Sequence, residues 1–365
     1  MRKVVFLHSK FPKSPHEIES LFTRWNMYGQ RVNTYASGSR ILIFSLKRKI
    51  SLDSSKYLYL SDELNYKSNS IVNYFNLFTV IARDSANYTV VTGDNQTSLL
   101  YGLLLRLRFP KRIRLQVQFH GNTYDSSVNK GFAGKIRVLT SRLAILFSDS
   151  IRIVSKFQEN EIKAIAQKKV LHFVCSPVPI DFRKIPTQRA IQSIDLLIVG
   201  RLHAERGTKE MVAILNELMS KDPLLRITVV GSGPDQKWIE NQLRLDLNDE
   251  TITFAGQVTA ELLREYYAKS KILLSTAPHE GYGLTIREAA LSGLRVVARR
   301  SAGATEAAKA YGSVIQMYES QEDARQVILQ SIASDLNISL TELKNLQLDA
   351  DNLALDYLVK SWIDD

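Results

Sequence analysis

Two glutamates flank a glycine-containing turn in the last third of the chain. Residues 279–290 read His-Glu-Gly-Tyr-Gly-Leu-Thr-Ile-Arg-Glu-Ala-Ala, so that Glu280 precedes the turn and Glu288 follows it. The apolar residues 271–275 predict a strand before the turn, and the composition from Leu284 onward predicts a helix after it. A Gly-x-Gly turn that opens a helix exposes unpaired amide N–H groups, which favour an anion. The stretch therefore predicts a pocket for a phosphorylated ligand, with two carboxylates to hold its hydroxyls.

Each part of this stretch also has an ordinary explanation. Glutamates near helix starts complement the helix dipole, and a single Gly-x-Gly is usually only a turn. The interpretation therefore depends on what the rest of the chain places beside it.

A second loop concentrates cations. Residues 200–209 read Gly-Arg-Leu-His-Ala-Glu-Arg-Gly-Thr-Lys and include Arg201, Arg206 and Lys209 next to a predicted helix start. Cations at a helix start oppose its dipole, which indicates that an anion binds there; the alternative is a solvated basic loop. Neither half of the chain has Gly-x-Gly-x-x-Gly after its first predicted strand, which argues against a dinucleotide cofactor.

Strands alternate with helices in both halves of the chain. The first half predicts strands at 4–8, 41–44, 57–60, 88–92, 114–120, 151–155 and 170–174, and the second at 195–199, 226–230, 252–255, 271–275 and 295–298. Such alternation predicts parallel sheets covered by helices on both faces. The prolines of 176–182 and the polar stretch after them mark a domain boundary. We expect domains at 1–180 and 181–348, with a helix at about 349–365 that packs back on the first.

The charge is uneven along the chain. The net charge is +11, but residues 1–184 hold 29 Lys and Arg against 12 Asp and Glu, or +17, whereas the remainder has 19 against 25, or −6. A basic half fits an anionic membrane surface, and no motif indicates nucleic-acid binding. The single cysteine, Cys175, excludes an internal disulfide, and no apolar run is long enough to cross a bilayer. We therefore expect a cytoplasmic protein, peripheral on the inner face of the cell membrane.

Taken together, the motifs resemble those of the retaining glycosyltransferases of family four. The resemblance is densest in the second half, and it rests on many motifs in the family's order: 199–202 with Arg206 and Gly207, 229–234, 254–258, 278–290, 293–298, and Gly303 with Glu306. It implies an α/β protein of the GT-B fold, in which two Rossmann-like domains face each other across a ligand cleft.

The resemblance also implies roles for residues. The donor would be a UDP or GDP sugar held by the second domain, with Arg201 and Arg206 or Lys209 neutralising the diphosphate. Glu280 would hold a sugar hydroxyl and Glu288 the ribose hydroxyls. The backbone near Val258 would meet the base, the amides of Gly281, Tyr282, Gly283 and Leu284 would contact sugar and phosphate, and His120 would reach the donor sugar from the first domain.

The family's chemistry implies no protein nucleophile, no metal and no cofactor. The acceptor would be a glycan or a polyprenyl-linked glycan, as in bacterial polysaccharide assembly. This chain departs from the family pattern at 10–15, where the usual Gly-Gly pair is absent, at Arg206 in place of lysine, and at Ala302, Arg299 and Arg300. Two alternatives remain open: a GT-B nucleotide-sugar epimerase and a non-catalytic basic protein of the membrane surface.

Overall fold

The computed structural model describes residues 2–8, 15–46, 52–53, 55–61, 70–93, 95–126, 129–167, 170–243, 251–332 and 339–364. The chain divides into two units, which are described separately. Unit 1 comprises residues 1–177 and 350–365, and unit 2 comprises residues 178–349. Helix α12 (Leu340–Ile363) runs from the second unit into the first. The predicted loop at 10–15 falls largely outside the described residues.

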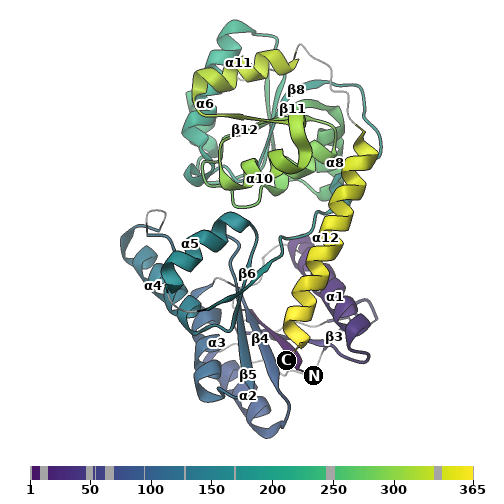
Figure 1. The fold of residues 1–365 in the computed structure, drawn as a ribbon. Helices are drawn as coiled ribbons and strands as arrows, with labels where there is room; N and C mark the ends of the chain where they lie inside the picture. The colour runs from purple at the N-terminus through teal and green to yellow at the C-terminus, as the bar shows by residue number, and fades with distance from the viewer. Residues whose placement is uncertain are drawn as a thin grey trace. The chain divides into compact units, whose positions relative to one another are not determined.

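Unit 1 is built on a parallel sheet in the order β3-β2-β1-β4-β5-β6-β7. The alternation of strand side chains gives the sheet two apolar faces: Val5 and Leu7 of β1 point into one core, and Val4 and Phe6 into the other. Helices α2 to α5 cover the first face, and α1 with the end of α12 covers the second (Figure 1). The elements are β1 (Lys3–His8), α1 (Pro15–Tyr35), β2 (Ile41–Ser45), β3 (Leu60–Ser61), α2 (Ser70–Arg83), β4 (Tyr88–Thr92), α3 (Gln96–Arg108), β5 (Ile113–Gln118), α4 (Gly131–Phe147), β6 (Ser150–Ile153), α5 (Lys156–Ala166) and β7 (His172–Cys175).

Unit 2 repeats the architecture with a parallel sheet in the order β10-β9-β8-β11-β12-β13. Helices α8, α9 and α10 pack on one face, and α6, α7 and α11 on the other. The elements are η1 (Phe182–Lys184), β8 (Ile194–Val199), η2 (Ala204–Arg206), α6 (Thr208–Lys221), β9 (Ile227–Val230), α7 (Gln236–Gln242), β10 (Ile252–Gly256), α8 (Ala260–Lys269), β11 (Ser270–Ser275), α9 (Leu284–Leu291), β12 (Arg295–Arg299), α10 (Ala302–Tyr311), η3 (Gly312–Val314), β13 (Ile315–Tyr318) and α11 (Gln321–Ile332).

Both sheets have the Rossmann strand order, in which the direction of winding reverses at the first strand. In unit 1 the reversal lies between β1 and β4, and in unit 2 it lies between β8 and β11. Ligands of such sheets bind beyond the carboxyl ends of the strands at this switch point, because the loops there diverge and leave a crevice. The fold therefore singles out one candidate place in each unit.

The predicted strand at 57–60 is wrong, and only Leu60–Ser61 pairs with β2. Turn chemistry decides this segment: the Asp53 side chain accepts from the Ser55 amide, and the Asp53 carbonyl accepts from the amides of Lys56 and Tyr57. Strand β13 is not among the predicted strands.

Candidate functional site

The loops that follow β8 and β11 touch each other at the switch point of unit 2. Gly207, which links η2 to α6, has φ +74°, and a Cβ placed on it would lie 2.1 Å from the carbonyl oxygen of Thr276. The Thr276 hydroxyl donates to the carbonyl of Arg206 at 2.9 Å. Only glycine permits this left-handed backbone at such close approach. The basic loop is thereby fixed against the end of β11.

This contact brings Arg206 to Glu280. Nη1 of Arg206 lies 2.8 Å from Oε2 of Glu280, and the two side chains are 28% and 13% exposed. The geometry is that of an ion pair without an aligned hydrogen bond, so that Oε2 of Glu280 accepts no hydrogen bond from the part of the chain that is described. A carboxylate oxygen in this condition retains the capacity to accept one from a ligand hydroxyl.

The turn after Glu280 is held by its own side chains. Oε1 of Glu280 accepts from the Gly283 amide at 3.3 Å, and Gly283 caps the start of α9 with φ +78°. The guanidinium carbon of Arg287 lies 4.1 Å from the centroid of the Tyr282 ring. Nε of Arg287 donates a hydrogen bond to the Tyr282 carbonyl. Gly281 and Leu284, whose amides are predicted to contact the donor, are partly exposed. A ligand could therefore reach this part of the turn.

Glu288 lies inside the unit. It is 2% exposed, and both of its oxygens have protein partners: Lys184 donates to Oε1 at 2.8 Å, and the Tyr267 hydroxyl donates to Oε2 at 3.2 Å. Burial raises the pKa of Glu288, while the charge of Lys184 opposes this effect. A carboxylate has room for further hydrogen bonds, and the ribose contact of Glu288 stays a prediction.

The other predicted donor residues lie around this centre. Arg201 lines the pocket at the end of β8 together with Arg206, but its side chain is 73% exposed and pairs with Glu205 at 3.4 Å. Lys209 is exposed on the first turn of α6. Val258 follows β10 and packs against the apolar core of unit 2. The enclosed space beside Arg201 and Arg206 is only about 30 Å³, which suits water and not a nucleotide.

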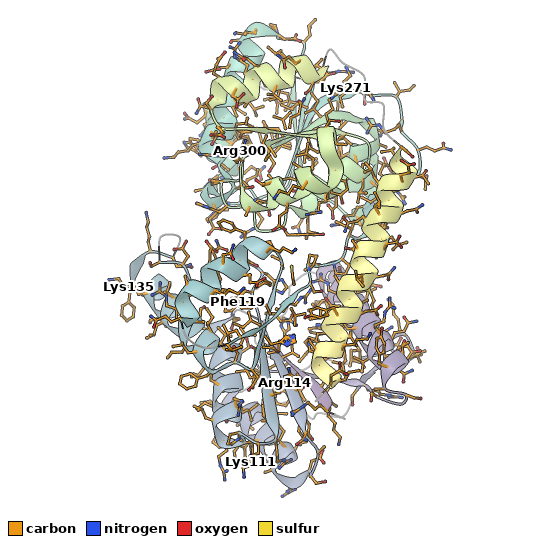
Figure 2. The ribbon with its side chains drawn as sticks, in the orientation of Figure 1. Lys111, Arg114, Phe119, Lys135, Lys271 and Arg300 are labelled. Atoms are coloured by element: carbon orange, nitrogen blue, oxygen red, sulfur yellow. The ribbon has the colours of Figure 1, made fainter. Side chains whose placement is uncertain are left out.

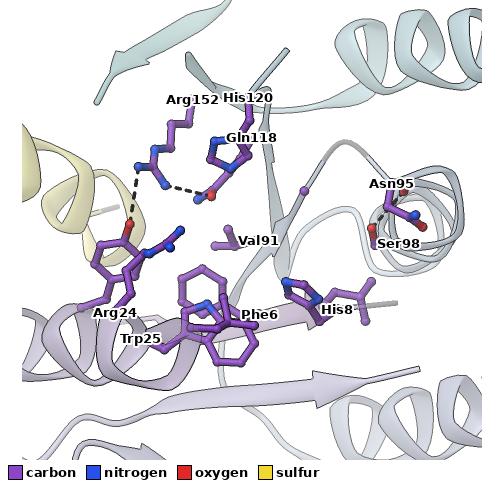
Figure 3. Close-up of a pocket in the computed structure, with 14 residues that line it drawn as sticks. Phe6, His8, Arg24, Trp25, Val91, Asn95, Ser98, Gln118, His120 and Arg152 are labelled. Atoms are coloured by element: carbon purple, nitrogen blue, oxygen red, sulfur yellow. Dashed lines mark hydrogen bonds between the residues drawn. The ribbon is translucent and has the colours of Figure 1, made fainter. Parts of the chain in front are cut away.

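His120 is the one predicted site residue in unit 1. It follows β5 and lines a pocket of about 280 Å³ at the switch point of that unit (Figure 3). His120 is exposed in the structure, yet the surrounding protein still desolvates its imidazole. Desolvation lowers the pKa of His120, and the positive charges of Arg152 and Arg24 lower it further. The imidazole is therefore neutral at pH 7.

Three residues that contact the predicted donor residues were not predicted from the sequence. Lys184 and Tyr267 hold Glu288, and Thr276 joins the two loops. Only the positions of two of them in the sequence could have drawn attention to them. Lys184 lies shortly after the boundary between the units, and Thr276 directly follows β11. Within the described residues, no three His, Cys, Asp or Glu side chains form a group that could hold a metal ion. No described helix combines the length and apolarity needed to span a bilayer.

Gly303 contacts the backbone of the turn at Glu280 and Tyr282, and its replacement tests whether this turn binds the donor. Its amide donates to the Glu280 carbonyl at 2.8 Å, and a Cβ would lie 2.8 Å from that oxygen and 2.9 Å from the Tyr282 amide nitrogen. Gly303→Ala should therefore displace the turn and weaken binding of a nucleotide sugar about tenfold, which corresponds to about 1.4 kcal/mol. Calorimetric titration would measure this affinity. The control is Ser313→Ala, at an exposed residue just beyond the far end of α10; equal affinities in the two variants would contradict the prediction.

Comparison with known proteins finds similarity in unit 2, which holds most of the predicted site residues. Residues 193–331 match the family model described as Glycosyl transferases group 1. This range holds Arg201, Arg206, Glu280 and Glu288. One subunit of the phosphatidylinositol N-acetylglucosaminyltransferase of Homo sapiens is 28% identical over 183 residues, which are 48% of this chain and 37% of the human protein. The chain thus spans less than half of that relative's length.

Solved structures share the whole fold. A glycosyltransferase from Rickettsia africae superposes with a TM-score of 0.68 at 15% identity, over all of this chain and 99% of its own. The Anabaena protein HepE, solved in complex with UDP and glucose, gives 0.64 at 15% identity, over 97% and 95%. The two Rossmann-like units have the GT-B fold, so the predicted fold class is confirmed. The family-model match confirms the resemblance to glycosyltransferases, whereas membership of family four stays a prediction.

Proposed function

We propose that this chain is a retaining glycosyltransferase of family four, which takes a sugar from a nucleotide diphosphate bound to unit 2. The observation that carries the proposal is the ion pair of Arg206 and Glu280, with an oxygen of Glu280 free to accept a hydrogen bond, at the switch point of the sheet. The match of residues 193–331 and the UDP in the HepE structure support the choice of ligand.

The geometry suggests how the donor would use this pair. The diphosphate competes with Glu280 for Arg206, because it carries more negative charge than one carboxylate. Glu280 is then available to accept a sugar hydroxyl. As the sugar–phosphate bond breaks, charge grows on the leaving phosphate and Arg206 stabilises it. The amides at the start of α9 face the same region, where the helix dipole adds to the effect.

The rest of the reaction follows the chemistry that the resemblance implies. The acceptor hydroxyl attacks the face that the phosphate leaves, and a phosphate oxygen takes its proton, so neither a protein nucleophile nor a metal is required. The acceptor would be a lipid-linked or polyprenyl-linked glycan, and the lipid in the name of the human relative favours this class.

Binding of the donor can be tested without knowledge of the acceptor. Isothermal titration with UDP and GDP should show saturable binding that Arg206→Gln weakens. Absence of binding for both would leave a non-catalytic surface protein as the better description. Incubation with a nucleotide sugar and no acceptor separates the remaining alternative, because an epimerase would convert the sugar and a transferase would not.

A membrane-facing surface is part of the proposal, and we assign it to α3 and α4 of unit 1. These two helices pack against each other. Large apolar side chains stand exposed at spacings of four and three residues along both, with Phe132 82% and Leu139 59% exposed. The full set is Leu100, Leu104 and Leu107 on α3, and Phe132, Ile136, Leu139, Leu143, Leu146 and Phe147 on α4.

Charge indicates what covers this face. Neither helix contains Asp or Glu, whereas Arg106, Arg108, Lys135, Arg137 and Arg142 lie on them. Figure 2 labels Lys135, which lies near the start of α4. Two copies of such a face would repel each other, while an anionic bilayer attracts the cations and accepts the apolar side chains. We therefore favour an anionic lipid surface over a second copy of the chain.

Leu139→Glu is expected to reduce binding to phosphatidylglycerol vesicles about tenfold or more, because it removes an exposed leucine that would enter the bilayer and adds a charge that the anionic lipid repels. Co-sedimentation at several salt concentrations would measure this, and wild-type binding should weaken as salt rises. The control is Leu262→Glu, at a leucine 40% exposed on α8 of unit 2. Equal binding of the two variants, or conversion of a wild-type dimer to a monomer by Leu139→Glu, would contradict the assignment.

A further inference from the structure

The pocket of unit 1 is cationic. It lies at the switch point of the sheet, where β1 ends at His8 and β4 leads into Gly93, and its volume is about 280 Å³. Arg24, Arg152, His8 and His120 line it, and no carboxylate does so in the described part of the chain (Figure 3). All four residues belong to unit 1, whereas the ion pair proposed to hold the donor lies in unit 2.

Arg152 is a buried cation without a counter-ion. It is 2% exposed, and its guanidinium donates to neutral acceptors: Nε to the Ser176 carbonyl at 2.7 Å, Nη1 to Oε1 of Gln118 at 3.0 Å and Nη2 to the Pro177 carbonyl at 3.0 Å. Over the described ranges, no carboxylate forms an ion pair with it. These hydrogen bonds fix the guanidinium but leave its charge unbalanced, and a buried charge is costly unless an opposite charge lies near.

Arg24 adds a second positive charge that is free to bind. It lies on α1, is half-buried, and has neither an ion pair nor a hydrogen bond within the described structure. Its guanidinium points into the pocket, toward the side on which Arg152 lies (Figure 3). A guanidinium fork that is exposed to a pocket and has no partner matches the geometry of phosphate oxygens.

The opposite wall is polar but uncharged. Ser98 lies in the first turn of α3, where its hydroxyl donates to the Asn95 carbonyl at 2.9 Å, and the side chain of Asn95 caps the helix. The start of this 13-residue helix therefore points its positive dipole end at the same space. Desolvation lowers the pKa of His120, and the positive charges of Arg152, Arg24 and His8 lower it further.

We propose that this pocket binds a phosphoryl group, with Arg24 as the direct contact and the buried charge of Arg152 behind it. Its volume lies just below the usual range for small-molecule sites, about 300–1,000 Å³, which fits a phosphoryl group with part of the molecule that carries it. One part of this proposal rests on the proposed function. If the chain is a glycosyltransferase, the phosphoryl group belongs to the acceptor, and the acceptor is a phosphate ester.

The test is calorimetric titration of the full-length chain with inorganic pyrophosphate in the presence of saturating UDP, which occupies the diphosphate site proposed in unit 2. Arg24→Gln should weaken pyrophosphate binding about tenfold or more, as expected for a charge-assisted contact. Arg40→Gln is the matched control, because Arg40 is exposed and precedes β2, at the amino edge of the same sheet. Arg24→Lys keeps the charge without the fork and should give an intermediate affinity.

Equal pyrophosphate affinity in the Arg24→Gln, Arg40→Gln and wild-type proteins would overturn the proposal. Competition by butyl phosphate would identify an organic phosphate as the ligand, whereas competition by inorganic phosphate alone would identify free phosphate; both outcomes retain the phosphoryl site. Should UDP fail to bind, the donor proposal fails by itself. Pyrophosphate binding that depends on Arg24 and not on Arg206 would then still establish the pocket.

Discussion

Arg206→Gln is expected to lower kcat about 10²–10³-fold, the usual effect of removing one preorganised donor from a developing negative charge. The backbone at Arg206 and Gly207 is held against Thr276, which fixes the position from which the Arg206 side chain reaches Glu280. Initial rates at saturating donor and acceptor would give kcat. Arg201→Gln makes the same change at a side chain that is 73% exposed, and it should cost less.

Glu280→Gln tests the other half of the ion pair. It should lower kcat/KM for the donor, because the amide holds a sugar hydroxyl less well than a carboxylate does. Glu280 and Arg206 touch at 2.8 Å, and their effects should therefore not add: the double variant should lose less activity than the product of the two single losses.

The matching control is thermal unfolding. Both single variants should unfold within a few degrees of wild type, because the pair is partly exposed and contributes little to stability. Full turnover by Arg206→Gln, in a protein with an unchanged unfolding temperature, would remove this residue from the active site.

The alternation of strands and helices and the glycine turn could be predicted from the sequence, because both depend on neighbouring residues. Apolar runs of four to six residues identified β8, β9 and β11, and the Gly-x-Gly turn identified the start of α9. The strand expected at 57–60 shows the limit. Its apolar pattern suits a strand, but the local hydrogen bonds of Asp53 impose turns instead.

The partners of the site residues could not be predicted, because they are distant in sequence. Arg206 meets Glu280 across 74 positions, and Lys184 meets Glu288 across 104. Which loops meet depends on the strand order, and the sequence does not state that β11 lies beside β8. For the C-terminal helix, the sequence predicted packing on the first domain but not the residues that meet: Trp362 of α12 joins the core that contains Phe6 and Trp25.

His120→Gln is expected to lower kcat/KM about 10²-fold if His120 contacts the reacting sugar, since glutamine offers a donor and an acceptor but not the imidazole geometry. The pH dependence discriminates further. Desolvation and the nearby arginines lower the pKa of His120, so its neutral form persists below pH 6.5. The activity ratio of wild type to His120→Gln should therefore stay constant from pH 8 to pH 6.5.

The same shift has a consequence for stability with a definite sign. Because the pKa of His120 is lower in the folded than in the unfolded chain, the unfolded chain binds more protons, and stability falls as the pH drops below about 6.5. Urea unfolding at pH 7 and pH 5 should show a smaller loss of unfolding free energy for His120→Gln than for wild type.

The activity ratio of wild type to His120→Gln gives the contrary outcome. If this ratio changed with pH with a midpoint near 6.5, the pKa of His120 would be that of an ordinary histidine. The positive potential attributed to Arg24 and Arg152 would then be screened in solution, which would weaken the case for an anion in that pocket as well.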